Sequence, residues 1–216
     1  MLQGKNIVLG VTGSIAVHKA VDIASKLTQQ GARVDVIMTP AATEFVKPLA
    51  FRSVTGRAVT TSMFETDTEF NIEHIALAQS ADVVVIAPAS ANTIAKIACG
   101  IADNMLCSTV LATRAPIIVA PAMNVNMWEN PVTRENTEKL RRRGFDIVGP
   151  AHGWLAEGRK GWGRMVEPPA VIDAVKIALG RGGDLAGKRI VVTSGGTQEP
   201  IDPVRHITNR SSGRMG

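Results

Sequence analysis

Apolar residues occur along this chain in short continuous runs and in longer stretches with helical spacing. The short runs, bounded by turn residues, predict strands at Asn6–Val11, Arg33–Met38, Asp82–Ala87, Pro116–Ala120 and Asp146–Val148. Apolar residues three and four positions apart predict helices at Ile15–Gln29, Ala91–Ala98, Asn104–Thr113, Val132–Arg143 and Val171–Leu179. Because the strand runs are continuous rather than alternating, they favour a parallel sheet covered on both faces. The repeated order of strand and helix predicts a doubly wound α/β fold, although it does not reveal the strand order.

Three segments depart from this pattern. Residues 51–71 show weak periodicity, and the Gly-rich residues 151–165 are typical of a binding loop or lid. A linker is predicted at 180–183, and Lys188–Thr193 predicts one more strand, with no helix after it. The 216 residues exceed a typical domain of about 150. We therefore expect one complete domain over 1–182, and over 183–216 a linker with the truncated start of a second α/β domain.

Composition and charge exclude several classes of protein. The chain is 45% apolar and has no run of the ~18 apolar residues that a membrane span needs, so we expect no membrane partner. Residues 185–216 hold five basic and two acidic residues, which is +3 of the net charge of +5. With no Tyr and 4% aromatic residues, stacking platforms for nucleic acid are scarce, and we expect no nucleic-acid partner. Cys99 and Cys107 lack metal-ligand spacing, which indicates buried free thiols in a reducing cytoplasm.

Small and short polar residues follow three predicted strands. The first strand leads through Gly13, Ser14 and Ile15 into a helix, which suits a mononucleotide phosphate bound by backbone amides, although a plain tight turn would look the same. Thr39 follows the second strand. The strand ending at 87 leads into Ser90 and Asn92, where Ser90 is the expected helix cap. Since the carboxyl ends of parallel strands share one edge of the sheet, these loops predict a ligand site there.

A further strand end carries side chains suited to a binding pocket. Ala122, Met123 and Asn124 open the stretch AMNVNMW, in which apolar side chains alternate with two Asn residues. Core packing explains the Met and Trp residues but not the paired Asn, whose amides can hold a carboxylate. His74 lies beside a carboxylate between apolar residues, and by spacing alone it has no assigned role.

Five sequence motifs together resemble a known family. TGSIA, NIEHI, APASANTIAK, PAMNVNMW and GWLAEGRKGWGRM are similar to the flavin-containing cysteine decarboxylases, and most to the decarboxylase half of bifunctional phosphopantothenoylcysteine decarboxylase/phosphopantothenate–cysteine ligases. The resemblance is continuous from residue 1 to about 182. The segment GGTQEPIDPVRHITNRSSGRMG resembles the start of the ligase half. Asn209 in it matches a ligase residue, but the ligase body is missing, so we expect no ligase activity from this chain.

The resemblance implies a Rossmann-like, flavodoxin-like domain that binds FMN and assembles as trimers, alone or in a dodecamer, with FMN and substrate between subunits. By position, the FMN-binding residues would be Gly13, Ser14, Ile15, Thr39, Ser90 and Asn92. His74 matches the active-site histidine, and Asn124, flanked by Met123 and Ala122, would bind the substrate carboxylate. No metal is implied. The implied reaction converts 4'-phosphopantothenoylcysteine to 4'-phosphopantetheine in coenzyme A biosynthesis: the flavin oxidises the cysteine moiety, CO₂ leaves, and the electrons return with a proton.

One residue departs from the family pattern. The flap motif G-x-x-x-C-G-x-x-G-x-G-R-M has Cys as the proton donor of the last step, whereas this chain has Glu157 there. Either the Glu157 carboxyl replaces the thiol as donor, which we favour, or the reductive half of the reaction is impaired. Two other functions stay open: oxidative decarboxylation of a peptide's C-terminal cysteine, and a non-catalytic flavoprotein scaffold or regulatory subunit.

Overall fold

The computed structural model describes residues 2–63 and 73–212. The chain divides into two compact units, Met1–Arg181 and Gly182–Gly216. Five predicted strands of the first unit are confirmed as β1 (Asn6–Val11), β2 (Arg33–Met38), β4 (Val83–Ala89), β5 (Ile117–Pro121) and β6 (Asp146–Ile147). The predicted helices are α1 (Val17–Gln29), α5 (Ala91–Cys99), α6 (Met105–Ala112), α8 (Pro131–Arg142) and α9 (Pro168–Gly180). Their ends lie within three residues of the predicted ones.

The apolar periodicity missed several elements because they are too short to show a repeat: helices of eight residues or fewer and one strand of two residues. They are α2 (Pro40–Thr43), α3 (Pro48–Thr55), β3 (Val59–Thr60), α4 (Glu73–Ser80) and α7 (Val125–Glu129). The weakly periodic segment 51–71 therefore contains the end of α3 and all of β3. Its residues 64–71 lie outside the described residues.

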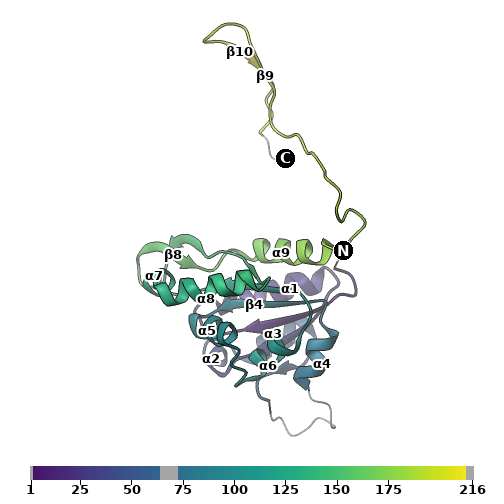
Figure 1. Ribbon diagram of the computed structural model, residues 1–216, viewed down its shortest axis with the longest axis vertical. Coiled ribbons are helices and arrows are strands. Elements are labelled where there is room, and N and C mark those ends of the chain that lie inside the picture. The colour runs from purple at the N-terminus through teal and green to yellow at the C-terminus, as the bar shows by residue number, and fades with distance from the viewer. Residues whose placement is uncertain (1, 64–72, 213–216) are drawn as a thin grey trace. The chain divides into compact units, whose positions relative to one another are not determined.

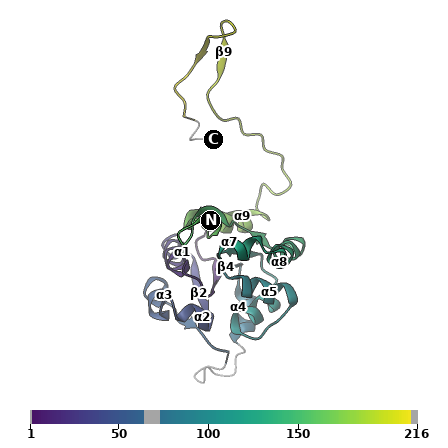
Figure 2. The same ribbon diagram turned by 90° about the vertical axis from the view of Figure 1, so that its left-hand side faces the viewer.

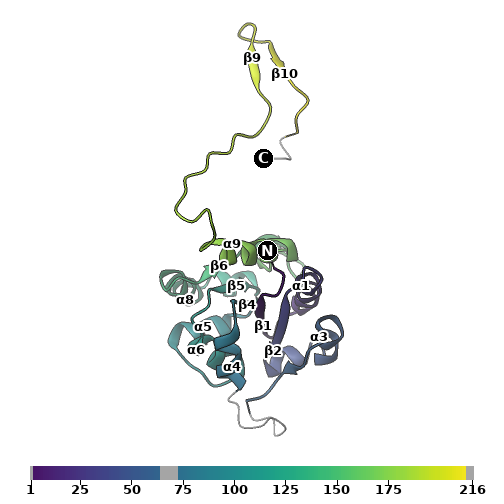
Figure 3. The same ribbon diagram turned by 90° about the vertical axis from the view of Figure 1, so that its right-hand side faces the viewer.

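The body of the first unit is a six-stranded sheet in the order β3-β2-β1-β4-β5-β6. All of its neighbouring strands pair in parallel, so the predicted doubly wound α/β fold is confirmed. Figures 1, 2 and 3 show the sheet between two helical layers, with α1, α3 and α9 against one face and α4, α5, α6 and α8 against the other.

Each face of the sheet has its own apolar core. One core joins the strands to α1, α3 and α9 through Ile23, Phe51 and Val175, all fully buried. The other joins them to α5, α6 and α8 through residues such as Ile94, Leu106 and Leu140. Because both faces are covered, the strands are apolar at consecutive positions rather than at alternate ones.

The chain reverses its direction of winding between β1 and β4. Strands β2 and β3 follow β1 on one side of it, whereas β4, β5 and β6 extend the sheet on the other. At such a switch point the loops after the two central strands diverge, which opens a crevice at the carboxyl edge of the sheet. The loops after β1, β4 and β5 meet at this edge.

The Gly-rich segment is an antiparallel hairpin, which corrects the expected loop. Strands β7 (Ala151–Trp154) and β8 (Lys160–Arg164) pair, with Gly153 opposite Gly161 and Trp154 opposite Lys160. Buried Gly161 and Gly163 alternate with exposed residues along β8. A Cβ on Gly161 would lie 2.9 Å from Val125 Cγ2, and one on Gly163 would lie 2.3 Å from the Met123 carbonyl oxygen. The glycines thus let the hairpin lie directly on α7 and the loop before it.

The second unit also differs from the prediction. Residues 188–193 form no strand, and Ile190, Val191 and Val192 are exposed. Instead, β9 (Gln198–Pro200) and β10 (His206–Thr208) make a short antiparallel hairpin. No described residue of this unit is buried, so Lys188–Thr193 has neither a pairing strand nor an apolar cover.

Two further observations concern the cysteines and the apolar helices. Cys107 is buried, and burial raises the pKa of its thiol, but Cys99 is exposed, which corrects the expectation of two buried thiols. Among the described residues, none of the helices is long and apolar enough to cross a membrane.

Candidate active site

A buried threonine joins the loops at the switch point. Thr12, directly after β1, donates through Oγ1 to the Pro88 carbonyl at 2.8 Å and accepts from the Ser90 amide at 2.9 Å. The Ala122 amide, after β5, donates to the Ala89 carbonyl at 3.0 Å. The ends of the three central strands β1, β4 and β5 are therefore held together by the protein's own hydrogen bonds.

The loop after β1 lies tightly against the loop after β2. A Cβ on Gly13 would lie 2.6 Å from Ala41 Cβ, so only glycine allows this approach. The Thr39 amide donates to the Val11 carbonyl at 3.0 Å, which holds the second loop in place. Thr39 Oγ1 is buried and has no hydrogen-bond partner, which makes it the one such side-chain atom in the described part of the chain. A buried hydroxyl without a partner beside a glycine turn is a donor available to a ligand.

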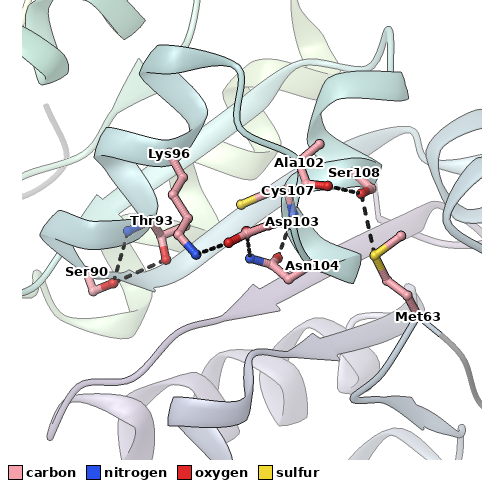
Figure 4. A network of polar contacts seen from close by, with 9 residues as sticks. All are labelled: Met63, Ser90, Thr93, Lys96, Ala102, Asp103, Asn104, Cys107 and Ser108. Atoms are coloured by element: carbon pink, nitrogen blue, oxygen red, sulfur yellow. Dashed lines mark hydrogen bonds and ion pairs between the residues drawn. The ribbon is translucent and has the colours of Figure 1, made fainter.

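The loop after β4 is stabilised by a capped helix. Ser90 Oγ accepts from the Thr93 amide at 3.3 Å, which confirms Ser90 as the cap of α5. Figure 4 shows a second set of polar contacts near the end of α5, where Asp103 accepts from the Lys96 ammonium at 2.5 Å and from the side-chain amide of Asn104, the cap of α6. The Lys96 ammonium lowers the pKa of the exposed Asp103 carboxyl. The helix that follows Ser90 is thus anchored at both of its ends.

A cavity of about 500 Å³ opens where these loops meet. It is bounded by the start of α1, the loops after β4 and β5, and the β7–β8 hairpin. The predicted site residues among its lining are Gly13, Ser14, Ile15, Ser90, Ala122, Met123, Asn124 and Glu157. The lining is mainly apolar with a few polar groups, as in small-molecule sites.

Asn124 and Glu157 contact each other in the wall of the cavity. Asn124 caps α7, and its Oδ1 accepts from the Asn126 amide at 2.7 Å. Its Nδ2 donates to Glu157 Oε2 at the turn of the hairpin. Since Oδ1 is held by the helix, Asn124 can present only its NH₂ group to the cavity wall, where it donates to the Glu157 carboxylate.

A buried lysine fixes the base of the hairpin. Lys19 of α1 is 9% exposed, and its ammonium donates to the Met165 carbonyl and to Glu167 Oε1, each at 2.9 Å. Arg164, at the end of β8, donates to the same Glu167 oxygen at 2.6 Å. The hydrogen bond from Lys19, assisted by Arg164, lowers the pKa of Glu167.

Sequence reasoning did not select Lys19 or Arg164, although both line the cavity. A signal was present for Lys19, which lies three residues after Ala16 and four before Ile23 on the apolar face of α1. A cation at such a position needs a partner when buried. The partner, Glu167, lies 148 residues further along the chain, so its identity could not be predicted.

Three predicted site residues do not line this cavity. Thr39 follows β2 and is held to the end of β1 through the Val11 carbonyl, and Asn92 is exposed on the first turn of α5. His74 is half-buried at the start of α4 and is also absent from the lining. A second cavity of about 440 Å³, between α5, α6 and β5, contains none of the predicted residues. Within residues 2–63 and 73–212, no three His, Cys, Asp or Glu side chains group as a metal site.

The switch-point cavity and the glycine turn define a candidate ligand site at the carboxyl edge of a doubly wound α/β sheet. Residues 1–180 match the family described as Flavoprotein. The chain belongs to the flavoprotein family. Residues 185–216 match a second family, the DNA/pantothenate metabolism flavoprotein C-terminal domain.

Individual relatives agree with this assignment. The chain is 44% identical over 215 residues to the coenzyme A biosynthesis bifunctional protein CoaBC of Haemophilus influenzae, covering 100% of this chain and 54% of that protein. It is 44% identical over 218 residues to the CoaBC of Bacillus subtilis, again covering 100% of this chain and 54% of the relative. The chain thus spans about half the length of these curated relatives.

Solved structures share the fold of the first unit. A PPC decarboxylase variant complexed with pantothenoylaminoethenethiol matches with a TM-score of 0.71 and 33% identity, covering 81% of this chain and 98% of that one. The FMN binding protein AtHal3 matches with a TM-score of 0.71 and 32% identity, covering 81% and 96%. The flavodoxin-like form of the fold is therefore confirmed.

Proposed function

We propose that this chain carries out the FMN-dependent decarboxylation of 4'-phosphopantothenoylcysteine to 4'-phosphopantetheine in coenzyme A biosynthesis. The observation that carries this proposal is the cavity in which Asn124 presents its amide beside the glycine turn after β1. The relatives named for coenzyme A biosynthesis and the PPC decarboxylase structure support the same reaction. The match of residues 185–216 to the DNA/pantothenate metabolism flavoprotein C-terminal domain favours this reaction over the peptidyl-cysteine alternative.

The residues around the switch point fit FMN. The glycine turn at Gly13 and the amides of Ser14 and Ile15 at the start of α1 suit a phosphate. We assign the unpaired Thr39 Oγ1, at the neighbouring strand end, as a further hydroxyl donor to the cofactor. We assign Ser90 and Asn92 to the same cofactor at the start of α5. When bound, FMN would supply the two-electron oxidation of the cysteine moiety and the later return of the electrons.

The chain's own residues position the substrate. We propose that the Asn124 amide holds the substrate carboxylate, while Met123 and Ala122 contribute apolar contacts at the same strand end. The hairpin covers this region, which reduces the access of water to the reacting centre. Loss of the carboxylate as CO₂ then takes place next to a neutral amide rather than a cation.

We assign Glu157 as the proton donor of the last step. It lies at the turn of the hairpin and contacts Asn124, so its carboxyl is beside the bound substrate. An impaired reductive half-reaction is the alternative, and it predicts that the wild-type protein accumulates the unsaturated, oxidised product. Loss of normal product in Glu157→Gln, with CO₂ release retained, would support the role of Glu157 as donor.

We infer that the protein is a homo-oligomer, built from trimers, with its sites between subunits. His74 supports this inference, because the assigned active-site histidine does not line the cavity of its own chain. The exposed Ile15 and Met127 at the cavity are also suited to cover by another copy.

We further propose that residues 1–182 form the decarboxylase domain and residues 183–216 a linker and part of a ligase domain. The division of the chain near residue 181 and the two family matches support this boundary. Because residues 183–216 are only a small part of such a domain, we expect no ligase activity from them.

The proposed function is tested by the colour and the product of the purified protein. We expect a flavin absorbance spectrum and CO₂ release from 4'-phosphopantothenoylcysteine, with Asn124→Ala retaining the flavin and losing at least about 100-fold in kcat/KM. A protein that binds no flavin would contradict the whole proposal. A flavin-containing protein that releases no CO₂ would instead support the non-catalytic scaffold.

A further inference from the structure

The cavity between α5, α6 and β5 lies at the amino edge of the sheet, away from the proposed active site. Its volume of about 440 Å³ falls within the range of about 300–1,000 Å³ that is typical of small-molecule sites. It opens between the ends of α5 and α6 and the segments that lead into β5 and β6. The proposed active site lies beyond the carboxyl ends of the strands, and the two cavities share no lining residue.

The walls of this amino-edge cavity are apolar. The Cys107 thiol belongs to the lining and is buried, and this burial raises its pKa, as expected in apolar surroundings. At the rim, Ile101 is 49% and Leu111 64% exposed, so large apolar side chains are open to solvent. An apolar group that covers them gains free energy from the water it displaces. The larger apolar side chains of the lining are Ile97, Ile101, Val110, Leu111, Ile117 and Phe145.

Two arginines add positive charge to this apolar cavity. Arg143, which precedes β6, donates through Nη1 to the Ala98 carbonyl at 2.8 Å, and this bond fixes its guanidinium near the end of α5. Arg114, which precedes β5, makes no hydrogen bond or ion pair with any residue that the structure describes. A guanidinium has five N–H donors, so both arginines have donors available to a ligand.

The neighbouring acidic side chains do not neutralise these arginines. Among the described residues that line the cavity, none is Asp or Glu. The acidic residues nearest to the lining in sequence are Asp103 and Asp146, and each already has a cationic partner. Asp103 accepts from the Lys96 ammonium at 2.5 Å, and Asp146 accepts from the Arg181 guanidinium at 2.7 Å. The charge that complements this cavity is therefore an anion from outside the chain.

We propose that the amino-edge cavity binds a small carboxylic acid with an apolar chain of medium length. The carboxylate accepts from Arg114 and from the free N–H groups of Arg143, while the chain lies among the apolar side chains of α5 and α6. A small ligand suits this concave surface because another protein would have to insert a protruding acidic segment flanked by apolar residues. The inference is independent of the proposed decarboxylation, since it uses none of the residues assigned to that reaction.

Octanoate and octan-1-ol form a matched pair of probes for this site. They have the same apolar chain, and only octanoate has a carboxylate. In titration calorimetry of the flavin-loaded protein, we expect octanoate to bind at one site per chain and at least about tenfold more tightly than octan-1-ol. Hexanoate should bind at least about fivefold more weakly than octanoate, because it buries two methylene groups fewer.

Substitutions at the rim separate the contribution of charge from that of apolar contact. Arg114→Gln should weaken octanoate binding by at least about tenfold and leave octan-1-ol binding unchanged. Leu111→Ala removes apolar surface but no charge, so it should weaken the binding of both ligands. Arg52→Gln, which removes an exposed arginine of α3 on the other face of the sheet, is the matched control and should bind both ligands as wild type does.

Three results would overturn the inference: no octanoate binding at millimolar concentrations, equal affinity for octanoate and octan-1-ol, or full octanoate affinity in Arg114→Gln. Sedimentation velocity tests the other occupant, a second copy of this chain. We expect wild type and Arg114→Gln to form particles of the same size, with or without octanoate, and a smaller particle in the variant would assign the cavity to a contact between copies. None of these results bears on the proposed decarboxylation, because no readout uses its activity.

Discussion

Thr39 shows how a single residue can mark a candidate ligand site. Its hydroxyl is buried without a partner, which costs free energy, and two residues further on Ala41 packs against the glycine turn that suits a phosphate. The sequence predicted Thr39 only as a short polar residue after a strand. Its burial and its lack of a partner became evident only when the loops after β1 and β2 were placed together.

Replacing Thr39 with Val should change stability and cofactor binding in opposite directions. Thr39→Val removes the unpaired hydroxyl, so the flavin-free protein should gain about 0.5–1 kcal/mol in free energy of unfolding. FMN affinity should fall by about tenfold, because a hydrogen bond to a charged group is lost. Chemical denaturation and flavin titration measure the two effects. Thr43→Val, which removes a hydroxyl already bonded to the Pro40 carbonyl, is the control and should leave FMN affinity unchanged.

Lys19 is the second residue whose role depends on distant partners. Its substitution by Met leaves the Met165 carbonyl without a donor, so we expect Lys19→Met to lose about 1–2 kcal/mol of unfolding free energy at neutral pH. Lys26→Met, which breaks only an exposed pair with Asp22 on the same helix, should lose less than about 0.5 kcal/mol. Equal losses in the two variants would show that the buried contacts of Lys19 contribute nothing.

The pH dependence of the same variants follows from Glu167. Because the pKa of Glu167 is lowered in the folded protein, its pairing stabilises the fold above the ordinary value of 4.5 and is lost as pH falls through the folded pKa. The stability difference between wild type and Lys19→Met should therefore shrink as pH is lowered below about 4.5. Denaturation curves at neutral and acidic pH test this, and a constant difference would contradict it.

At the scale of elements, the hairpin β7–β8 is the clearest departure from the prediction. The Gly-rich composition predicted a loop, yet small and large residues alternate along Lys160–Arg164 with the period of a strand. The signal was missed because glycine is depleted in strands and carries no apolar pattern. Here the glycines are required by contact, since α7 and the Met123 backbone lie against them.

Gly163 should be intolerant of any side chain. Its φ of 140° and the nearby Met123 carbonyl oxygen make Gly163→Ala strained, so we expect a loss of about 1–3 kcal/mol and a displaced hairpin. In Gly153→Ala the new Cβ meets only the Arg164 side chain, which can move, so the loss should be smaller. Thermal denaturation compares the two, and trypsin cleavage at Arg159 and Lys160 reports the hairpin. A Gly163→Ala protein as stable and as resistant as wild type would contradict the argument.

At the scale of the whole molecule, two features are not explained by the first unit alone. His74 lies away from the cavity that its assigned role requires, and none of the described residues of the second unit, 182–212, is buried. The first feature supports sites shared between copies, and the second supports the assignment of residues 183–216 to a larger domain.

Mixing two inactive variants tests whether sites are shared. If His74 and Asn124 of one site come from different subunits, co-refolded His74→Asn and Asn124→Ala chains should regain activity at roughly a quarter of their sites. Each variant alone should stay inactive, and an inactive mixture that still forms mixed oligomers would contradict shared sites.

The exposed apolar residues of the second unit predict that its backbone is not protected from hydrogen exchange. Val191 is 82% and Val204 88% exposed, so the backbone of 188–212 should exchange its amide hydrogens without measurable protection. A chain ending at residue 182 should keep the melting temperature and decarboxylase activity of the present one. Strong protection over Lys188–Thr193 would show that another surface covers this run.

The sequence by itself determined the alternation of strands and helices, and with it the fold class, because these follow from apolar periodicity within a few residues. It also located the strand-end loops that carry Gly13, Ser90 and Asn124. Only the tertiary structure decided the strand order, the hairpin, the absence of a strand at Lys188–Thr193 and the contacts that define the site. The reason is distance along the chain: Asn124 and Glu157 are 33 residues apart, and Lys19 and Glu167 are 148 apart. Such pairs form only when the packed sheet and helices bring them together, and local patterns contain no information about them.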